Sequence, residues 1–455
     1  MGLGGREDVL MNQIALGDIS AWTVIEGHSV TAPFRRASVH FDFSSYPRVK
    51  EKIEIQLSGS PAQISAGLGM LEKVILRSEA YDRAEYAHPQ MLRFQQTSGG
   101  AYYYSQIFDC YLEAHPTGYF KHQTGSRLVT LHYTRLNQFD GDQVELPLTG
   151  RGGADVTGGF DLINHTDLTS TNGNFVMIKA NDAVTDLPAP LRIELENTWP
   201  SNKIKDLYLG VFHHPTHDDE AIFYAFATDL SGGTQYYNAN AINDYYRRVS
   251  WTSSAWTALY NYPIPITEVD DLDGRTFRPI LHLYNSHAFT DLFLRIKLMR
   301  GAYTLQTCDA VYADPNYQYV LFPPLQLPPN QLLREMLPHH VEIMIYGLKE
   351  DGAAAQIDVD CLQLLPLDYA ATFHGFFDMS QDDILIDDSF RGLSNVRYSA
   401  VGSETVAHMR IGGPLLLYPD QNSFLFFMLA NENNTMDILR TSTLKVFYRP
   451  RLRLL

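Results

Sequence analysis

Lys52-Ile53-Glu54-Ile55-Gln56-Leu57 is the stretch that decides the fold, because polar and apolar side chains alternate in it at every position. A period of two is the pattern of a half-buried β-strand, whose successive side chains point to opposite faces of a sheet. Short alternating or apolar runs separated by turn residues recur along the rest of the chain. The sequence therefore predicts a mainly β protein.

The alternation stops at Ser58-Gly59-Ser60-Pro61, and a different period follows. Pro suits the first position of a helix, and Ser60 is available as the cap before it. Apolar residues then recur at helical spacing, at Ile64, Leu68, Leu71, Ile75 and Leu76. We expect one amphipathic helix in the N-terminal domain, from Pro61 to about Arg83.

Length and composition indicate several hydrophobic cores. A single core seldom grows beyond about 250–300 residues, so a chain of 455 residues predicts more than one domain. Aromatic residues make up 12% of the chain, with 27 Tyr and 24 Phe, and these residues favour strands. Many short strands with turn residues between them are typical of a β-sandwich or jelly roll.

The predicted domain boundaries follow from glycines and strand spacing. Residues 146–159 contain five glycines and no apolar periodicity, which indicates a flexible connection. We therefore expect an N-terminal β-sandwich with its helix at 1–150, a jelly-roll-like sandwich at 151–370 and a C-terminal β domain at 371–455.

Charge and cysteine usage limit the partners and the location. A formal net charge of −17 disfavours binding to nucleic acid and to anionic membranes. The N-terminal Met1–Asp8 is charged where a signal peptide is apolar, and no stretch approaches the ~20 apolar residues of a membrane span. Cys110, Cys308 and Cys361 lie far apart in apolar runs, as buried free thiols do. We expect neither secretion, membrane insertion nor a nucleic-acid partner, and a chain made in a reducing cell interior.

The densest polar cluster is His213-His214-Pro215-Thr216-His217-Asp218-Asp219. Imidazole and carboxylate groups are ligands for zinc, and His213, His217 and Asp218 are the candidate set. A loop interrupted by proline does not present its side chains as a helical His-Glu-x-x-His motif does. An exposed polar loop is the simpler interpretation, and we predict no metal and no cofactor.

Acidic clusters provide no clear catalytic motif. The stretch Glu268–Gly274 fails the register of an EF-hand. Asp382-Asp383 and Asp387-Asp388 flank Ile384–Ile386 and are interpreted as solvated carboxylates around a short strand. No Gly-x-Ser-x-Gly elbow occurs, although two of the 52 acidic residues could still form a glycosidase pair. We predict that the protein is not an enzyme and name no catalytic residues.

Four aromatic residues close together in the central section allow a carbohydrate-binding interpretation. Trp251, Trp256, Tyr260 and Tyr262 could stack on sugar rings if they lie exposed on β-loops. They could equally belong to a core or an interface. Trp251 and Trp256 are the candidate glycan-stacking residues.

The strand Ile53–Leu57, the helix from Pro61 and the aromatic hairpin Met91–Leu112 follow one another in the first section. This order resembles the N-terminal domain of bacteriophage distal-tail proteins. Later segments are similar to those of long prophage proteins with the same layout, namely Gly158-Gly159-Phe160, Leu187–Ile193, Leu362–Asp368 and Val446–Arg451. The resemblance implies a siphophage-type tail component with a ring-forming N-terminal domain, commonly hexameric, and appended sandwiches that face outward. It supplies no catalytic residues.

We therefore expect a non-enzymatic structural protein of a phage tail, a distal-tail or tail-tip component. It would self-assemble into a ring, connect the tail tube to tip proteins, and belong to a virion assembled in the host cytoplasm. The expected partners are copies of itself and other phage tail proteins. The sequence leaves open a carbohydrate-binding adhesion module that contacts a host surface glycan, another virion protein such as a tail-tube, capsid or decoration protein, and a glycan-cleaving enzyme.

Overall fold

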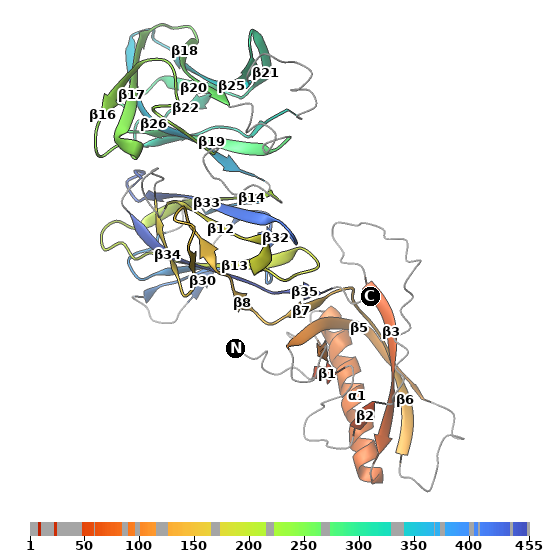
Figure 1. Cartoon of the computed structure of the whole chain (residues 1–455). Helices are drawn as coiled ribbons and strands as arrows, with labels where there is room; N and C mark the ends of the chain where they lie inside the picture. Colours follow the sequence, from red (N-terminus) through yellow and green to blue (C-terminus); the bar gives the residue numbers. More distant parts are fainter. Residues whose placement is uncertain are drawn as a thin grey trace. The chain divides into compact units, whose positions relative to one another are not determined.

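The computed structural model describes residues 8–10, 22–24, 48–58, 60–83, 90–95, 101–114, 126–164, 173–214, 223–264, 274–328, 341–367, 369–373, 378–399, 405–407, 410–436 and 440–452. The chain forms two compact units. Unit 1 comprises Met1–Val144, Thr185–Leu187 and Arg449–Leu455, and unit 2 comprises Glu145–Val184 and Pro188–Tyr448. The described residues are mainly β with a single α-helix (Figure 1), which confirms the predicted fold class. No helix among them is both long and apolar enough to cross a membrane.

Unit 1 is a β-sheet with helix α1 (Pro61–Asp82) packed on one face. The sheet runs in the order β1 (Asp8–Leu10), β4 (Met91–Gln95), β5 (Tyr102–Ala114), β6 (Ser126–Leu136), β3 (Arg48–Ser58) and β2 (Trp22–Val24), and β7 (Phe139–Gly141) pairs with β5 and β35 (Arg451–Leu452). The alternating stretch Lys52–Leu57 lies within β3.

Helix α1 begins at Pro61, as predicted, and the Ile64 N–H donates to the Ser60 carbonyl at 3.0 Å. Leu71 and Val74 are fully buried against the sheet, and Ile64 and Leu68 pack beside them. Leu76, which was assigned to the same face, is 62% exposed. Each residue advances the helix by about 100°, so Leu76, five residues after Leu71, points away from the sheet. Val74 occupies the buried position that was expected for Leu76.

Unit 2 contains two sandwiches, and we call the first the base sandwich. Its seven-stranded sheet runs β10 (Asp155–Val156), β9 (Leu148–Thr149), β12 (Phe175–Ile178), β33 (Asn422–Asn431), β14 (Ile204–His214), β27 (Tyr369–Phe373), β31 (Ile411–Gly412). Its eight-stranded sheet runs β11 (Phe160–Ile163), β34 (Thr441–Tyr448), β13 (Ala189–Glu196), β28 (Ile384–Asp388), β29 (Leu393–Arg397), β30 (Thr405–Ala407), with β32 (Leu416–Leu417) on β13 and β8 (Val144–Glu145) on β34.

The second sandwich, which we call the inserted sandwich, is built from strands between β14 and β27. Its seven-stranded sheet runs β16 (Thr234–Tyr237), β17 (Tyr245–Thr252), β26 (Ala354–Pro366), β19 (Thr276–Leu283), β23 (Tyr319–Leu321), with β15 (Tyr224–Phe226) on β26 and β24 (Leu325–Gln326) on β19. Its five-stranded sheet runs β18 (Thr257–Ile264), β25 (Val341–Lys349), β20 (Leu292–Arg300), β21 (Tyr303–Thr307), with β22 (Val311–Tyr312) on β20.

The division of the chain differs from the predicted boundaries at 150 and 370. Strands of residues 371–455 do not form a separate domain, because β28 to β34 complete both sheets of the base sandwich and β35 joins unit 1. The predicted domain 151–370 is likewise shared between the base and the inserted sandwich. Strand periodicity shows which faces are buried but not which distant strand is the partner, so the pairing could not be predicted.

The connections make each module an insertion into the one before it. In unit 1, β7 pairs with β35, so the chain leaves and returns at neighbouring strands. Arg451 and Asp140 form a buried ion pair there, with Nε 2.8 Å from Oδ1. In unit 2, β14 pairs with β27, and the inserted sandwich begins after the first of these strands and ends before the second. The topology is therefore nested.

Strand β33 connects the cores of the two sandwiches because both of its faces are buried. Leu425, Phe427 and Leu429 point into the base sandwich. Phe424 and Phe426 point the other way, into a cluster shared with the inserted sandwich. The ring centroid of Phe426 lies 4.4 Å from that of Phe223, which immediately precedes β15. An aromatic cluster thus holds the inserted sandwich on the base sandwich.

We predict that Phe426→Ala lowers the free energy of unfolding of unit 2 by about 3–5 kcal/mol, because it removes a fully buried ring from this cluster. Urea unfolding followed by fluorescence measures the change. Tyr237→Ala, at a position 67% exposed on β16, is the matched aromatic control and should change stability by less than about 0.5 kcal/mol. Equal effects of the two substitutions would show that the cluster does not hold the sandwiches together.

Candidate functional site

The predicted metal ligands are only partly within the described residues. His217 and Asp218 lie outside them. His213, at the end of β14, is buried, and its Nδ1 lies 2.8 Å from the hydroxyl of Ser423. Burial lowers the pKa of His213 to about 3. In the part of the chain that the structure describes, no group of three or more His, Cys, Asp or Glu could hold a metal ion.

The acidic clusters differ from their predicted environment. Residues 268–273 lie outside the described part of the chain. Asp383, Asp387 and Asp388 are buried rather than solvated, so the prediction is wrong for these three, whereas Asp382 is exposed as predicted. The carboxylate of Asp383 accepts hydrogen bonds of 2.7 Å from the backbone N–H groups of Ser380 and Ser399. Asp383 therefore holds a turn in place, a role that a run of acidic residues does not show by itself.

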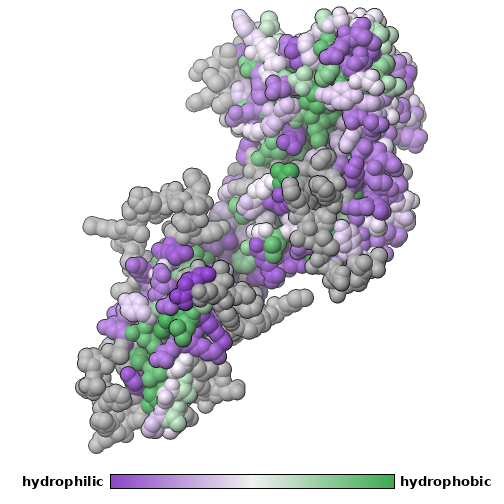
Figure 2. All heavy atoms as spheres, turned by 180° about the vertical axis from the view of Figure 1, so that it is seen from behind, coloured by the Kyte–Doolittle hydropathy of each residue, from purple (hydrophilic) through white to green (hydrophobic). Residues whose placement is uncertain are grey.

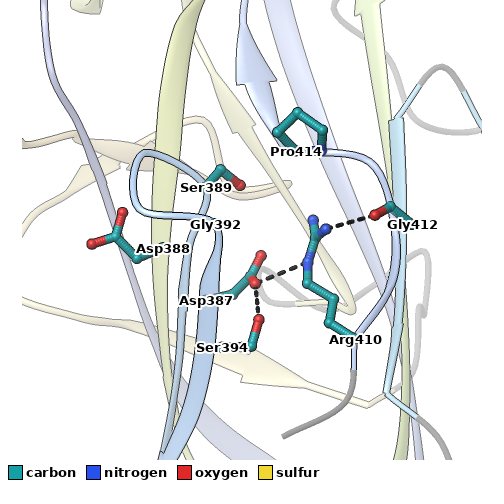
Figure 3. Close-up of a pocket in the computed structure, with 8 residues that line it drawn as sticks. All are labelled: Asp387, Asp388, Ser389, Gly392, Ser394, Arg410, Gly412 and Pro414. Carbon is teal, nitrogen blue, oxygen red and sulfur yellow. Dashed lines mark hydrogen bonds and ion pairs between the residues drawn. The ribbon is translucent and has the colours of Figure 1, made fainter. Parts of the chain in front are cut away.

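A surface pocket of about 620 Å³ lies beside β28 and is lined by Asp387, Ser394 and Arg410, among others (Figure 3). Asp387 Oδ1 lies 2.9 Å from Arg410 Nε and accepts a hydrogen bond from the Ser394 hydroxyl. Burial raises the pKa of Asp387, although Arg410 opposes that shift. The Arg410 Nη1 group also donates to the Gly412 carbonyl at 2.9 Å. Asp387 and Arg410 are therefore paired with each other within the pocket.

The two adjacent carboxylates at this pocket do not converge on a common point. Asp387 points toward Arg410, whereas Asp388 points to the opposite side of the strand (Figure 3). Asp388 accepts hydrogen bonds from the backbone N–H groups of Phe390 and Arg391 at 3.1 and 3.2 Å. A glycosidase needs two carboxyl groups that face one sugar site. Asp387 and Asp388 do not meet that requirement.

Asp360, in β26, is a buried acid that the sequence did not single out. Its side chain is 4% exposed, and Oδ1 accepts a hydrogen bond of 3.2 Å from the Ile242 N–H at the start of a 3-10 turn (Ile242–Asp244). Burial raises the pKa of Asp360 to about 8. Raised carboxyl pKa values are common in active sites. Here the group is enclosed, so a substrate cannot reach it.

The two tryptophans proposed for glycan stacking lie in different places. Trp251 is buried in the core of the inserted sandwich, so the prediction is wrong for this residue. Its ring packs so close to Gly347 that a Cβ there would lie 2.9 Å away. Trp256 is half-buried, and the guanidinium carbon of Arg295 lies 4.1 Å from its ring centroid. Tyr260 and Tyr262 belong to the core. The structure does not bring the two tryptophans together.

Trp256 belongs to a larger cluster on the five-stranded sheet, which we call the aromatic–cation face and define as Trp256, Phe293, Arg295, Lys297, Tyr312 and Tyr346. Along β20, buried side chains alternate with partly exposed ones, and Phe293, Arg295 and Lys297 are on the partly exposed side. Arg295 pairs with Tyr346 across β20 and β25.

Both cations of this face lie over aromatic rings. The guanidinium of Arg295 is 5.7 Å from the ring centroid of Tyr346, in addition to its contact with Trp256. The ammonium of Lys297 is 4.7 Å from the same Tyr346 centroid. Such contacts stabilise a cation without neutralising its charge. No ion pair joins Arg295 or Lys297 to a carboxylate among the described residues, and Glu342, on the same side of β25, instead accepts a hydrogen bond of 3.2 Å from Asn261.

A second aromatic group lies on the seven-stranded sheet of the inserted sandwich, where Tyr236, Tyr246 and Tyr284 form a stack. Successive centroids are 5.4 and 4.5 Å apart, with nearly parallel rings. Arg248 lies 5.3 Å from the Tyr236 centroid and donates two hydrogen bonds of 2.7 Å to Asp358. Here the rings cover one another and Asp358 neutralises the cation. This stack therefore leaves less ring surface and less positive charge for a ligand than the aromatic–cation face does.

Comparison with known proteins identifies no relative by sequence: no family model matches the chain, and no curated protein matches it. Among solved structures, the crystal structure of the infectious bursal disease virus VP2 subviral particle is 10% identical, with a TM-score of 0.18, over 69% of this chain and 81% of that chain. At this TM-score the likeness carries no argument about fold or function.

We predict that unit 2 loses stability in acid because of its buried histidines. The pKa of His213 is lowered by burial from 6.5 to about 3, and that of His282 to about 4. Below pH 6.5 the unfolded chain binds these protons first, so the free energy of unfolding falls as the pH decreases. Urea unfolding at pH 7 and pH 5 measures the difference.

Replacement of His213 by Asn should reduce that difference by up to about 2 kcal/mol. His214→Asn is the control, because His214 is half-buried on the same strand, and it should reduce the difference less. An unchanged pH dependence in His213→Asn would contradict the buried neutral state of His213.

We predict the opposite pH dependence for Asp360. Its pKa is raised from 3.8 to about 8, so its contribution to stability is complete below pH 3.8 and is lost as the pH rises to 8. Asp360→Asn should therefore gain stability relative to the parent chain between pH 5 and pH 8. The exposed Asp161→Asn is the control and should show no such gain. A constant offset of Asp360→Asn at both pH values would contradict the raised pKa.

Proposed function

We propose that this chain is a non-enzymatic structural component of a virion, and specifically of a phage tail. In this proposal unit 1 assembles with copies of itself into a ring, and the ring connects the tail tube to tip proteins. The nested topology is the observation that carries the proposal. Chain insertions that enter and leave at neighbouring strands are tolerated by the host domain, because its own sheet stays continuous.

The pairing of β7 with β35 keeps the sheet of unit 1 closed around the point of insertion. Unit 1 can therefore repeat in an assembly while it carries a large module in one connection. The same argument applies to β14 and β27, between which the inserted sandwich begins and ends. Such a protein separates an assembling part from a displayed part, as the tail-protein resemblance also implies.

Exposed apolar side chains support an assembling role for the chain. Leu76 on α1 and Tyr111 on β5 of unit 1 are 62% and 58% exposed, and unit 2 also exposes such side chains, including Tyr303 on β21 at 75%. Figure 2 shows apolar residues gathered on the visible face of unit 1. Apolar surface that stays exposed in a single chain is typical of a site for association. A net charge of −17 keeps such a precursor soluble.

The positions of Asp387, Asp388 and Asp360 support a non-enzymatic role. Asp387 and Asp388 point apart, and Asp360 is enclosed. Neither arrangement presents an acid and a base to one substrate. The proposal therefore assigns the protein to assembly rather than to turnover.

We predict that the purified chain forms a discrete ring or stacked rings as its concentration increases. Light scattering coupled to gel filtration and negative-stain electron microscopy measure the mass and shape. Leu76→Glu should shift the equilibrium toward monomer, because it places a charge on the exposed face of α1 without breaking the helix. Leu393→Glu, 53% exposed on β29 of unit 2, is the matched control and should assemble as the parent does.

Two outcomes contradict this proposal. A chain that remains monomeric at high concentration has no assembling unit. A chain in which Leu393→Glu disrupts the particle and Leu76→Glu does not would assemble through unit 2.

A further inference from the structure

We propose that the aromatic–cation face of the inserted sandwich binds an anionic saccharide, with Arg295 and Lys297 holding the acidic groups and Trp256 and Tyr312 contacting the sugar. This binding goes beyond the proposed structural role and does not depend on ring formation. It follows from the positions of two cations, their lack of carboxylate partners among the described residues, and the rings beside them.

The two cations are presented in register on one strand. Arg295 and Lys297 are two residues apart on β20, so both side chains are on the same side of the sheet, with backbones about 7 Å apart. β20 has β25 on one side and β21 and β22 on the other, so it does not lie at an edge of the sheet. A strand in that position is held by hydrogen bonds on both sides, which fixes the spacing of its side chains.

The guanidinium of Arg295 is oriented before any ligand arrives. Its stacking on Trp256 at 4.1 Å fixes the plane of the group and leaves its edge for hydrogen bonding. The buried Nε atom of Arg295 has no hydrogen-bond partner in the described structure. Because this Nε atom is buried, a ligand would meet the terminal N–H groups of the guanidinium, which can match a carboxylate through two parallel hydrogen bonds. The second cation, Lys297, supplies a point charge next to it.

The positive charge of Arg295 and Lys297 favours an acidic ligand. In a chain with a net charge of −17, two adjacent cations remain without an ion pair to any described carboxylate. The contrast with Arg248, which donates two hydrogen bonds to Asp358, shows that the same sandwich neutralises an arginine where its role is structural. Glu342 is bonded to Asn261 and forms no ion pair with either cation. The positive charge on this face is therefore left for a ligand.

The aromatic rings favour a saccharide over other anions. Tyr312 is 43% exposed, and its ring lies 5.7 Å from that of Phe293 at the other end of the face. Aromatic rings contact the apolar C–H faces of sugars, while simple phosphate makes no use of them. The negative charge of the whole chain disfavours long, densely charged polymers such as nucleic acid. A sugar that carries scattered carboxylates satisfies both the rings and the cations.

The test is binding of the full chain to immobilised saccharides, measured by biolayer interferometry. The probes are oligogalacturonate, hyaluronate and sialyllactose as acidic sugars, maltohexaose as a neutral sugar, and polyglutamate and polyphosphate as anions without sugar. We expect at least one acidic sugar to bind, with affinity that falls as salt increases, and maltohexaose, polyglutamate and polyphosphate to bind at least tenfold more weakly.

The variants separate the contributions of charge and ring. The double variant Arg295→Gln, Lys297→Gln should lose at least tenfold in affinity, and Trp256→Ala should also weaken binding. The affinity of Arg295→Lys should lie between that of the parent chain and that of the double variant, because lysine keeps the charge but not the planar donor pair. Arg397→Gln, which removes an exposed arginine from β29 of the base sandwich, is the matched charge control and should bind as the parent does. Circular dichroism checks that each variant is folded.

Four results overturn the proposal. No binding to any acidic sugar removes the site. Equal binding of maltohexaose removes the role of the cations. Equal or tighter binding of polyglutamate or polyphosphate indicates an acidic protein segment or a general anion surface in place of a saccharide site. Unchanged binding in the double variant places the saccharide elsewhere on the chain.

Discussion

Strand β33 has two apolar faces, and the architecture of unit 2 depends on that constraint. One face fills the base sandwich through Leu425, Phe427 and Leu429, and the other carries Phe424 and Phe426 into the cluster beneath the inserted sandwich. An ordinary sandwich strand buries one face and exposes the other to water. Without a second layer, β33 would expose two phenylalanine rings, so the inserted sandwich is required by the sequence of the base sandwich.

This constraint connects the fold to the proposed roles. Because the cluster fixes the inserted sandwich on the base sandwich, the five-stranded sheet of the inserted sandwich is supported by a packed core rather than by a flexible linker. The aromatic–cation face is therefore built on a rigid element, as precise recognition requires. In the proposed function the assembling surface lies on unit 1, which has its own sheet, its own helix and its own core. Assembly and ligand binding can thus change independently.

The sequence predicted the local elements well because they depend on neighbouring residues. The alternation at Lys52–Leu57 lies in β3, and the helix begins at Pro61 as its proline indicated. The same reasoning could not show that the run Ser423–Leu429 is buried on both faces, since periodicity does not distinguish a strand between two layers from any other apolar run. The nested order of the domains follows from those distant pairings.

The candidate site was predicted in part, and the reason is visible at the two tryptophans. Trp251 ends up inside and Trp256 outside, because the chain crosses from the seven-stranded to the five-stranded sheet between β17 and β18 and the alternation starts again. Tyr346 lies 51 residues after Arg295 in sequence, so no local pattern could place the two beside Trp256. The alternation of β20 did contain a usable signal, namely two basic residues on its polar side.

The most direct test of this account is a cryo-electron microscopy map of the assembled particle that resolves strands. We predict that neighbouring subunits contact one another through unit 1 and that the surface around Trp256 and Arg295 faces solvent. A particle whose subunits are joined through that surface would contradict both the structural role given to unit 1 and the binding role given to the inserted sandwich.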